Sequence, residues 1–512
     1  MLKPIINVKM KTRNADPLSS AADVLVAAIC SDVKAMDSTI AQLDRKLAGA
    51  IAKLKKLGDF DAKDGTIALI YSHAAIPAKR ILLLGLGEKK KLEPDTIRKA
   101  ASLAGVKAVQ IRAKNITVAA STFTVKLDPE ATACALAEGF HFGSYCYDEY
   151  VTSAPEPRPA LLNIELADAD RQRINLFDRG VRYGNIVGRA QSYARTIANR
   201  PGNVINPVTL AAEAGKLAAK TAGLTCTIFD EKQLKARGMG GILAVGSGSK
   251  SPPRLIVLKY NAARSKTAKP VIALIGKAIT FDSGGINLKP SNGMQEMKFD
   301  KSGGAAVMGA FKAISELRPR INVYGIIPSA ENLPGASSYR PGDIIKTFSG
   351  KTVEVQNTDA EGRMILTDAL HYATKLRCGI IVDIATLTGA CKVALGTYMA
   401  GVMGNDDKLI EQLKTASKQS GEKIWHMPSG PEYLEEMKST IADLKNIGSK
   451  WGGACTGAAF LGEFAGKTKW AHIDIAGVDC FEKPSAAAAI GASGFGVRLL
   501  TSFLMAIDQK TA

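Results

Sequence analysis

The stretch VIALIGKAITFDSGG, residues 271–285, decides the fold class of this 512-residue chain. Its first five residues, Val271–Ile275, are apolar without polar alternation, which is typical of a strand buried on both faces. Working outward, the patterns predict strands over Leu255–Tyr260, Asn322–Pro328, Lys351–Gln356 and Gly379–Ala385, and helices over Gly304–Leu317 and Met364–Leu376. This alternation predicts an α/β domain with a largely parallel central sheet, which binds ligands at the carboxyl ends of its strands.

Two clusters of ionisable residues follow these predicted strands. The first places Lys277 and Asp282 directly after the strand that ends at Ile275. Lys289 stands on the outgoing loop, and Asp300 precedes the next helix. Two glycines after Asp282 allow the chain to turn sharply there.

The second cluster is NTDAEGR, residues 357–363. In an extended segment alternate side chains share one face, so Asp359, Glu361 and Arg363 are predicted to project together. A single aspartate in a loop is more often a helix cap than a ligand. Seven ionisable residues in loops after strands instead indicate one functional site.

The residue types favour a metal site built from oxygen ligands. Carboxylates without histidines suit hard or borderline metal ions, and none of the five histidines has the H-E-x-x-H spacing. Crowded carboxylates would otherwise raise one another's pKa. Two divalent cations would balance the four negative charges of Asp282, Asp300, Asp359 and Glu361.

A pair of such ions would have a defined chemistry. Held ~3.5–4 Å apart, they would lower the pKa of a bridging water to near neutrality. A lysine ligates a metal only as the neutral amine, so the ion must displace its proton. Lys289 and Arg363 would remain as cations for an anionic guest or a developing oxyanion.

The two clusters closely resemble those of the leucyl (cytosol) aminopeptidases, the M17 family of metallopeptidases. Residues 357–363 match the signature N-T-D-A-E-G-R, and Gly276–Gly285, Leu288–Pro290 and Met297–Asp300 match the other metal segment at the family spacing. The resemblance covers roughly residues 195–512 and is weak over 1–165.

The resemblance implies two domains joined by a helix. An amino-terminal α/β domain similar to macro domains is expected over 1–165, a linking helix over 166–198, and a catalytic domain over 199–512. The residues themselves predict a strand at Ile81–Leu86, helices at Asp95–Leu103 and Asp168–Ile197, and a proline-rich linker at Thr152–Pro159. The family further implies a homohexamer, a trimer of dimers.

The resemblance also implies a ligand set for each of two metal ions. The tighter ion would be held by Lys277, Asp282, Asp300 and Glu361. The more exchangeable ion would be held by Asp282, Asp359 and Glu361. The family uses Zn, Mn, Mg and Co.

Catalytic and specificity roles are carried over in the same way. Lys289 would stabilise the oxyanion, and Arg363 would hold a bicarbonate that acts as general base toward the bridging water. The free α-amine of a peptide would bind a metal, which implies release of amino-terminal residues, preferentially leucine and other apolar ones. Met297, Thr386 and Gly389 match positions that line the pocket for the first side chain, although a plain core role fits them equally well.

Two departures from the family pattern stand inside the metal segment. Ala278 replaces a usual glycine, which is tolerable unless its φ is positive. Lys301 and Ser302 follow Asp300 where the family has an apolar residue and a cysteine. A positive charge at Lys301 would weaken a neighbouring metal or shift its preference.

Charge and composition leave one alternative function open. The net charge is +19, which makes a DNA-binding regulatory or architectural role conceivable. Only 6% of residues are aromatic, so a base-stacking platform is disfavoured.

No apolar run reaches the ~18–20 residues of a membrane span, and the start lacks the apolar core of a secretory signal. We therefore expect a cytoplasmic location. The eight cysteines are scattered along the chain without a C-x-x-C pair, so we expect them to be reduced thiols.

Overall fold

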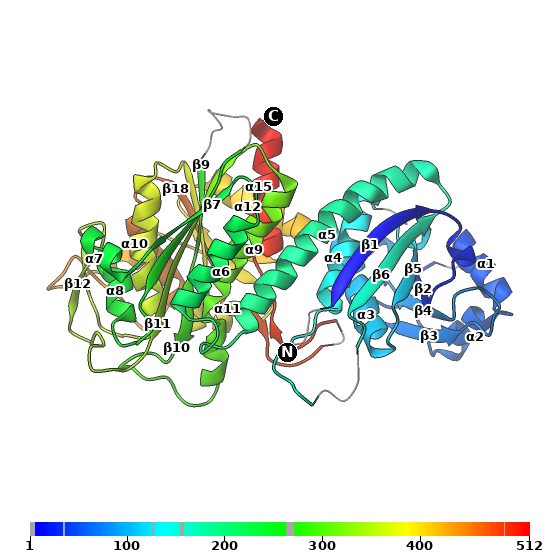
Figure 1. Ribbon diagram of the computed structural model, residues 1–512, viewed down its shortest axis with the longest axis horizontal. Helices are drawn as coiled ribbons and strands as arrows, with labels where there is room; N and C mark the ends of the chain where they lie inside the picture. The colour runs from blue at the N-terminus through cyan, green and yellow to red at the C-terminus, as the bar shows by residue number, and fades with distance from the viewer. Residues whose placement is uncertain are drawn as a thin grey trace. The chain divides into compact units, whose positions relative to one another are not determined.

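The computed structural model describes residues 6–33, 36–124, 127–153, 158–262, 271–485 and 487–511. The chain forms two compact units, Met1–Ser192 with Phe481–Ile490, and Tyr193–Cys480 with Gly491–Ala512. The chain passes from the first unit to the second within one long helix, α5 (Arg171–Asn199). Each unit has its own sheet covered by helices on both faces (Figure 1).

Within the described residues, the amino-terminal unit is built on a six-stranded sheet. Five neighbouring strands run parallel, and only the edge strand β3 runs antiparallel to its neighbour β4. In order across the sheet the strands are β1 (Asn7–Asn14), β6 (Leu161–Asp168), β5 (Asn115–Ala119), β2 (Val24–Ile29), β4 (Arg80–Gly85) and β3 (Ile67–Tyr71). The strand predicted at Ile81–Leu86 is confirmed as β4.

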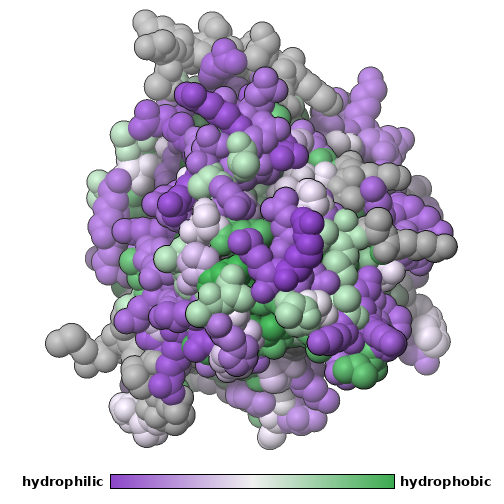
Figure 2. Space-filling model, turned by 90° about the vertical axis from the view of Figure 1, so that its right-hand side faces the viewer, coloured by the Kyte–Doolittle hydropathy of each residue, from purple (hydrophilic) through white to green (hydrophobic). Residues whose placement is uncertain are grey.

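Helices bury both faces of this sheet. On one face α3 (Pro94–Gln110) and α4 (Pro129–Gly143) enclose a core with alternate residues of the strands. On the other face α1 (Ser38–Lys46) and α2 (Ala50–Leu57) enclose a second core. The side of the molecule that carries α1 and α2 is mainly hydrophilic, with small apolar areas between polar ones (Figure 2). The helix predicted at Asp95–Leu103 is confirmed inside α3.

The segment before the long helix differs from its prediction. Residues 161–168 form strand β6, which pairs with β1 and β5, and α5 begins at Arg171 instead of Asp168. The helix begins there because the Asp170 carboxylate accepts the backbone N–H groups of Gln172 and Arg173, which caps the first turn. Part of the linker predicted at Thr152–Pro159 lies outside the described residues.

The carboxyl-terminal unit contains a larger mixed sheet. Its four central strands, β18 (Lys469–Asp474), β14 (Ile380–Ala385), β9 (Val271–Gly276) and β11 (Asn322–Asn332), are mutually parallel. The outer strands β15 (Ala400–Gly404), β16 (Ile424–His426), β8 (Arg254–Tyr260) and β7 (Leu224–Phe229) flank them, and β10 (Ala278–Asp282) pairs with the far end of β11. The largely parallel centre is confirmed. The strand predicted at Leu255–Tyr260 is real but antiparallel to both neighbours.

Two helical layers cover this sheet (Figure 1). One layer contains α7 (Glu231–Arg237), α8 (Gly240–Gly246), α10 (Glu361–Lys375) and α14 (Gly453–Ala465), whose apolar residues form one core with the strands. The other layer contains α6 (Pro207–Ala219), α9 (Ser302–Leu317), α12 (Asp407–Ser420) and α15 (Val497–Thr511). Strands β12 (Ile344–Lys346) and β13 (Thr352–Glu354) precede α10 in the chain and form a small sheet with β17 (Leu444–Lys445).

No helix in the part of the chain that the structure describes combines the length and the apolar character needed to cross a bilayer.

Close helix packing in the amino-terminal unit generates a stability prediction. A Cβ on Gly139 of α4 would lie 2.2 Å from the Arg98 carbonyl oxygen of α3, whereas a Cβ on Gly215 of α6 would meet nothing within 4 Å. We expect Gly139→Ala to lower the free energy of unfolding by about 2 kcal/mol through overpacking. The matched control Gly215→Ala should raise it by about 0.5–1 kcal/mol, because alanine is the better helix former. Calorimetric unfolding of both variants checks the opposite signs, and equal effects would contradict the packing argument.

Candidate metal centre

Four chain segments bring the predicted ligands to the carboxyl ends of the central strands. Lys277 lies between β9 and β10, and Asp282 is the last residue of β10. Asp300 lies in the 3₁₀ helix η4 (Met294–Lys301) that precedes α9. Asp359 stands in the loop before α10, and Glu361 is the first residue of that helix. The parallel sheet therefore gathers residues that are up to 84 positions apart, from Lys277 to Glu361.

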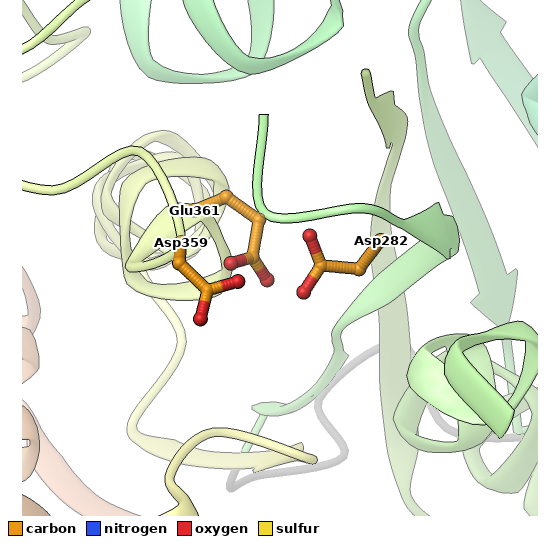
Figure 3. Close-up of side chains that lie close together, drawn as sticks. All are labelled: Asp282, Asp359 and Glu361. Atoms are coloured by element: carbon orange, nitrogen blue, oxygen red, sulfur yellow. The ribbon is translucent and has the colours of Figure 1, made fainter. Parts of the chain in front are cut away.

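Three of the carboxylates face one another (Figure 3). One oxygen from each of Asp282, Asp359 and Glu361 lies within 4.8 Å of the other two. Asp282 and Glu361 are each only 2% exposed. Such a buried group of hard oxygen donors is the arrangement that a divalent cation stabilises.

Lys277 lies at the back of this group. Its ammonium nitrogen is 2.7 Å from Asp300 Oδ1 and 2.8 Å from Glu361 Oε1, and it donates a 2.7 Å hydrogen bond to the Thr386 carbonyl. Burial alone would lower the pKa of this amine, but the carboxylates of Asp300, Glu361 and Asp282 outweigh burial and raise the pKa. A Cβ on Gly362 would lie 2.6 Å from Lys277 Nζ, so the glycine after Glu361 provides the space for the amine.

Asp300 completes the pocket around the amine. Its Oδ1 accepts a 2.6 Å hydrogen bond from the Thr386 hydroxyl, while its Oδ2 is buried with no hydrogen-bond partner among the described residues. Burial raises the pKa of this carboxyl well above its usual range. An orphaned, buried carboxylate oxygen beside other carboxylates fits a metal ligand, because a cation would satisfy it.

Lys289 bridges the more open side of the cluster. Its ammonium nitrogen is 2.9 Å from Asp282 Oδ2 and also pairs with Asp359. The side chain is 21% exposed, so it borders solvent. Burial acts to lower its pKa, but the carboxylates of Asp282, Glu361 and Asp359 raise it, and the side chain stays a cation.

Burial and neighbouring charges shift the pKa values of the carboxyl groups in this cluster. Burial raises the pKa of Asp282 to about 6, and the Glu361 carboxylate acts in the same direction. Burial and Glu361 also raise the pKa of Asp359. For Glu361 itself burial is outweighed by Lys277 and Lys289, which lower its pKa. The mutual repulsion predicted from the sequence is therefore present in the structure.

Hydrogen bonds from neutral groups join the two acidic loops. The Thr358 hydroxyl donates to the Gly284 carbonyl at 2.6 Å, and the Thr358 N–H donates to Asn287 Oδ1 at 2.8 Å. Gly284 and Gly285 have φ values of +86° and +67°, and a Cβ at Gly285 would lie 2.7 Å from Asn332 Oδ1. The sharp turn predicted at these glycines is thus confirmed.

Asn332 is a site residue that the sequence analysis missed. Its amide donates to Asp282 Oδ1 at 2.8 Å and to the Thr358 carbonyl at 3.0 Å, so it links both acidic loops. The strand expected to end at Pro328 continues as β11 to Asn332. Its position at the carboxyl end of a central strand, beside the predicted cluster, is the signal that could have identified it.

Arg363 does not share a face with Asp359 and Glu361 in the predicted manner. The expectation of an extended segment is wrong, because α10 begins at Glu361. The Arg363 guanidinium is 7% exposed and donates to the Asn446 carbonyl at 2.9 Å. Burial lowers its pKa to about 10, against the opposing effect of Glu361.

The residues expected at the substrate pocket lie in three elements. Met297 is half-buried in η4, and Thr386 follows β14 and binds Asp300. Gly389 begins the helix α11 (Gly389–Leu395), and a Cβ there would meet nothing within 4 Å. Gly389 therefore borders open space, whereas Thr386 contacts Asp300 and Lys277 directly.

The two departures from the family pattern have local explanations. Ala278 is fully buried without a positive φ, and a Cβ on Gly304 would lie 2.8 Å from its methyl group, so the glycine opposite makes room for it. The buried ammonium of Lys301 donates to the backbone carbonyls of Arg200 and Lys298. It forms no ion pair with Asp300 within the described part of the chain.

Comparison with known proteins agrees with this geometry. The catalytic-domain model of the cytosol aminopeptidase family matches residues 192–501, and its amino-terminal-domain model matches residues 26–153. A probable cytosol aminopeptidase of Geobacter sulfurreducens is 44% identical over 92% of this chain and 94% of its own. One from Alkaliphilus metalliredigens is 37% identical over 98% of this chain and 100% of its own.

Solved structures of similar proteins support the same assignment. A mutant of tomato leucine aminopeptidase superposes with a TM-score of 0.86 at 32% identity, covering 98% of this chain and 97% of its own. The bottromycin maturation enzyme BotP, in complex with Mn, gives a TM-score of 0.83 at 32% identity, covering 95% of this chain and 100% of its own. With both domain models matched and relatives aligned along nearly its whole length, this chain belongs to the cytosol aminopeptidase family and is an M17 aminopeptidase.

Proposed function

We propose that this aminopeptidase uses two divalent metal ions to release amino-terminal residues, preferentially leucine and other apolar ones, from peptides. The observation that carries the proposal is the convergence of Asp282, Asp359 and Glu361, whose oxygens lie within 4.8 Å of one another. The relatives named cytosol aminopeptidase support a cytoplasmic location for this activity.

The chain offers a ligand set for each ion. The tighter ion would take Lys277, as the neutral amine, with Asp282, Asp300 and Glu361. The exchangeable ion would take Asp282, Asp359 and Glu361. Four carboxylates balance two dications, and the orphaned Asp300 Oδ2 supports its role as a ligand. Oxygen donors suit Mn, Zn, Mg or Co, and the Mn complex of BotP favours Mn as the first ion to test.

Lys289 has a role in catalysis beside that of the metal ions. When bound, the ions supply a water of lowered pKa and polarise the scissile carbonyl. Lys289 lies at the partly exposed edge of the cluster and keeps its charge, so it can stabilise the oxyanion that develops at that carbonyl. This role needs a cation that interacts more strongly with the transition state than with the substrate.

Arg363 is assigned to bind bicarbonate, which would accept a proton from the attacking water. The guanidinium is buried, and its contact with the Asn446 carbonyl fixes one of its nitrogens. Its other donors can hold a planar anion through two parallel hydrogen bonds, which is the recognition geometry that arginine favours. Burial strengthens that attraction because water is excluded from the pair.

Selectivity for the first side chain is assigned to Met297, Thr386 and Gly389. Met297 contributes an adaptable apolar surface. The absence of a side chain at Gly389 leaves open space that a leucine-sized group can occupy. Thr386, which holds both Lys277 and Asp300, couples this pocket to the metal cluster.

The metal assignment predicts the effect of neutralising one bridging carboxylate. Glu361→Gln should lower kcat/KM for leucine p-nitroanilide by at least ~10³-fold, because an amide is a weak ligand and the site loses a charge shared by both ions. Metal analysis should show reduced Mn or Zn content, while circular dichroism shows a folded protein. The matched control Glu411→Gln, on the exposed side of α12, should retain wild-type activity. Full activity of Glu361→Gln would refute the metal assignment.

The oxyanion role predicts an asymmetric kinetic effect at Lys289. Lys289→Ala should lower kcat by about 10²–10³-fold with a much smaller change in KM, because its charge partner appears mainly in the transition state. Steady-state kinetics at saturating Mn measure both constants. A variant in which KM rises as much as kcat falls would assign Lys289 to substrate binding instead.

We also propose that the chain assembles as a homohexamer. Large apolar side chains of the carboxyl-terminal unit are exposed in the single chain, among them Val393 at 88%, Tyr398 at 79% and Trp451 at 71%. Exposed apolar groups of this size are typical of surfaces that bind a partner. Light scattering after size exclusion should give about six times the 54.1 kDa of one chain. A monomer at micromolar concentration would contradict the assembly.

A further inference from the structure

The loop between β14 and α11 connects the candidate metal centre to the pocket assigned to the first side chain. At its start, Thr386 donates its hydroxyl to Asp300 and accepts a hydrogen bond from Lys277 at its carbonyl. At its end, Gly389 borders open space, because a Cβ there would meet nothing within 4 Å. The two residues between them therefore set the spacing between the metal centre and the pocket.

Helix α11, which follows this loop, buries little of its own surface. Of its 7 residues only Cys391 is buried in the single chain, and Val393 is 88% exposed. A helix this short is not stable by itself, so contacts at its ends must fix its position. The start of the pocket therefore depends on what holds the first turn of α11.

Asp474, the last residue of β18, holds this first turn. Its Oδ1 accepts the backbone N–H groups of Leu387 at 3.1 Å and Thr388 at 3.4 Å. Its Oδ2 accepts a 2.7 Å hydrogen bond from the Thr388 hydroxyl. The same hydroxyl oxygen accepts the Cys391 N–H at 3.0 Å and so caps α11. One carboxylate therefore fixes both central residues of the loop and, through Thr388, the helix that follows.

The turn that begins at Asp474 also contacts the middle and the far end of α11. The Cys391 thiol donates to the Asp474 carbonyl, with 3.6 Å between sulfur and oxygen. A Cβ on Gly477 would lie 2.2 Å from the carbonyl oxygen of Gly396, which directly follows the helix. The exposed helix is therefore attached to β18 along its whole length.

The chemistry of Asp474 favours a positioning role. The residue is 0% exposed and forms no ion pair with any residue that the structure describes. Its charge is stabilised by hydrogen bonds instead, with the Ala476 N–H as a further donor at 3.2 Å. Such charge-assisted hydrogen bonds are stronger than neutral ones. A carboxylate also has no donor of its own, so the Thr388 hydroxyl must donate to it and keeps a lone pair for the Cys391 N–H.

We propose that Asp474 is a positioning residue for substrate selectivity. It holds residues 386–388 and the start of α11 so that the pocket at Gly389 distinguishes a leucine-sized first side chain from a smaller one. The inference rests on the proposed aminopeptidase function and its pocket assignment. None of the hydrogen bonds that Asp474 forms with described residues goes to a proposed metal ligand.

Steady-state kinetics of the full chain with Mn test the proposal on leucine and alanine p-nitroanilides. Asp474→Asn should lower the ratio of kcat/KM for leucine to that for alanine at least about tenfold, because the leucine side chain fills the pocket and the alanine methyl does not. Most of the change should be a rise in KM for leucine, as expected when a binding contact is lost. A smaller fraction of folded enzyme would reduce both activities equally and leave the ratio unchanged.

Thr388 provides an independent pair of variants. Thr388→Val keeps the shape of the side chain without its hydroxyl and should lower the ratio as Asp474→Asn does. Thr388→Ser keeps the hydroxyl and should retain the wild-type ratio. The control Asp407→Asn makes the same chemical change at an exposed position of α12 and should have wild-type kinetics. If Asp474→Asn has no thermal unfolding transition, Thr388→Val decides.

Hydrogen exchange measured by mass spectrometry reports on the loop itself. Asp474→Asn and Thr388→Val should increase exchange over residues 387–396 but not over α10, and Mn content should match the wild type. A leucine-to-alanine ratio within about twofold of the wild type in the folded variants would overturn the proposal. A wild type without preference for leucine would refute the proposed selectivity and this inference together.

Discussion

The catalytic unit depends on confining negative charge in its interior. Four carboxylates converge within a sheet–helix junction, and their charges must be compensated before the surrounding loops can pack. Lys277 and Lys289 each contact two of them, from the buried and the open side respectively. Asp282, Asp300 and Glu361 are buried, and the low dielectric around them strengthens repulsion and attraction alike. Chemistry and fold stability therefore depend on the same ion pairs.

Hydrogen bonds from uncharged side chains hold the two acidic loops in position. Thr358 and Asn332 connect the loop after β10 to the loop before α10, so the carboxylates stay within a few ångströms of one another although they repel. A hydroxyl and an amide are suited to this task because they add no charge to a cluster that already has an excess of it. The acidic residues supply the negative charge, and these uncharged neighbours hold them in place.

Most of the candidate site's residues could be singled out from the sequence, because they follow apolar strands within short, distinctive motifs. Asn332 was missed because the strand was predicted to end at Pro328, and proline is uncommon inside a central strand. The structure explains the exception: β11 pairs with β9 up to Ile326 and with β10 from Ser329, so Pro328 lies where the partner strand changes and no ladder bond is lost on that side. Strand β6 was missed as well, because its pairing with β1 joins residues some 150 positions apart.

The space left by Gly362 has a consequence for how this enzyme can change. The amine of Lys277 occupies the volume that a side chain at position 362 would need, and three contacts prevent it from moving aside. A single added carbon would therefore displace the Lys277 amine from inside the helix, 2.6 Å from its Nζ. The position of the Lys277 amine between Asp300 and Glu361 therefore depends on the absence of a side chain at residue 362.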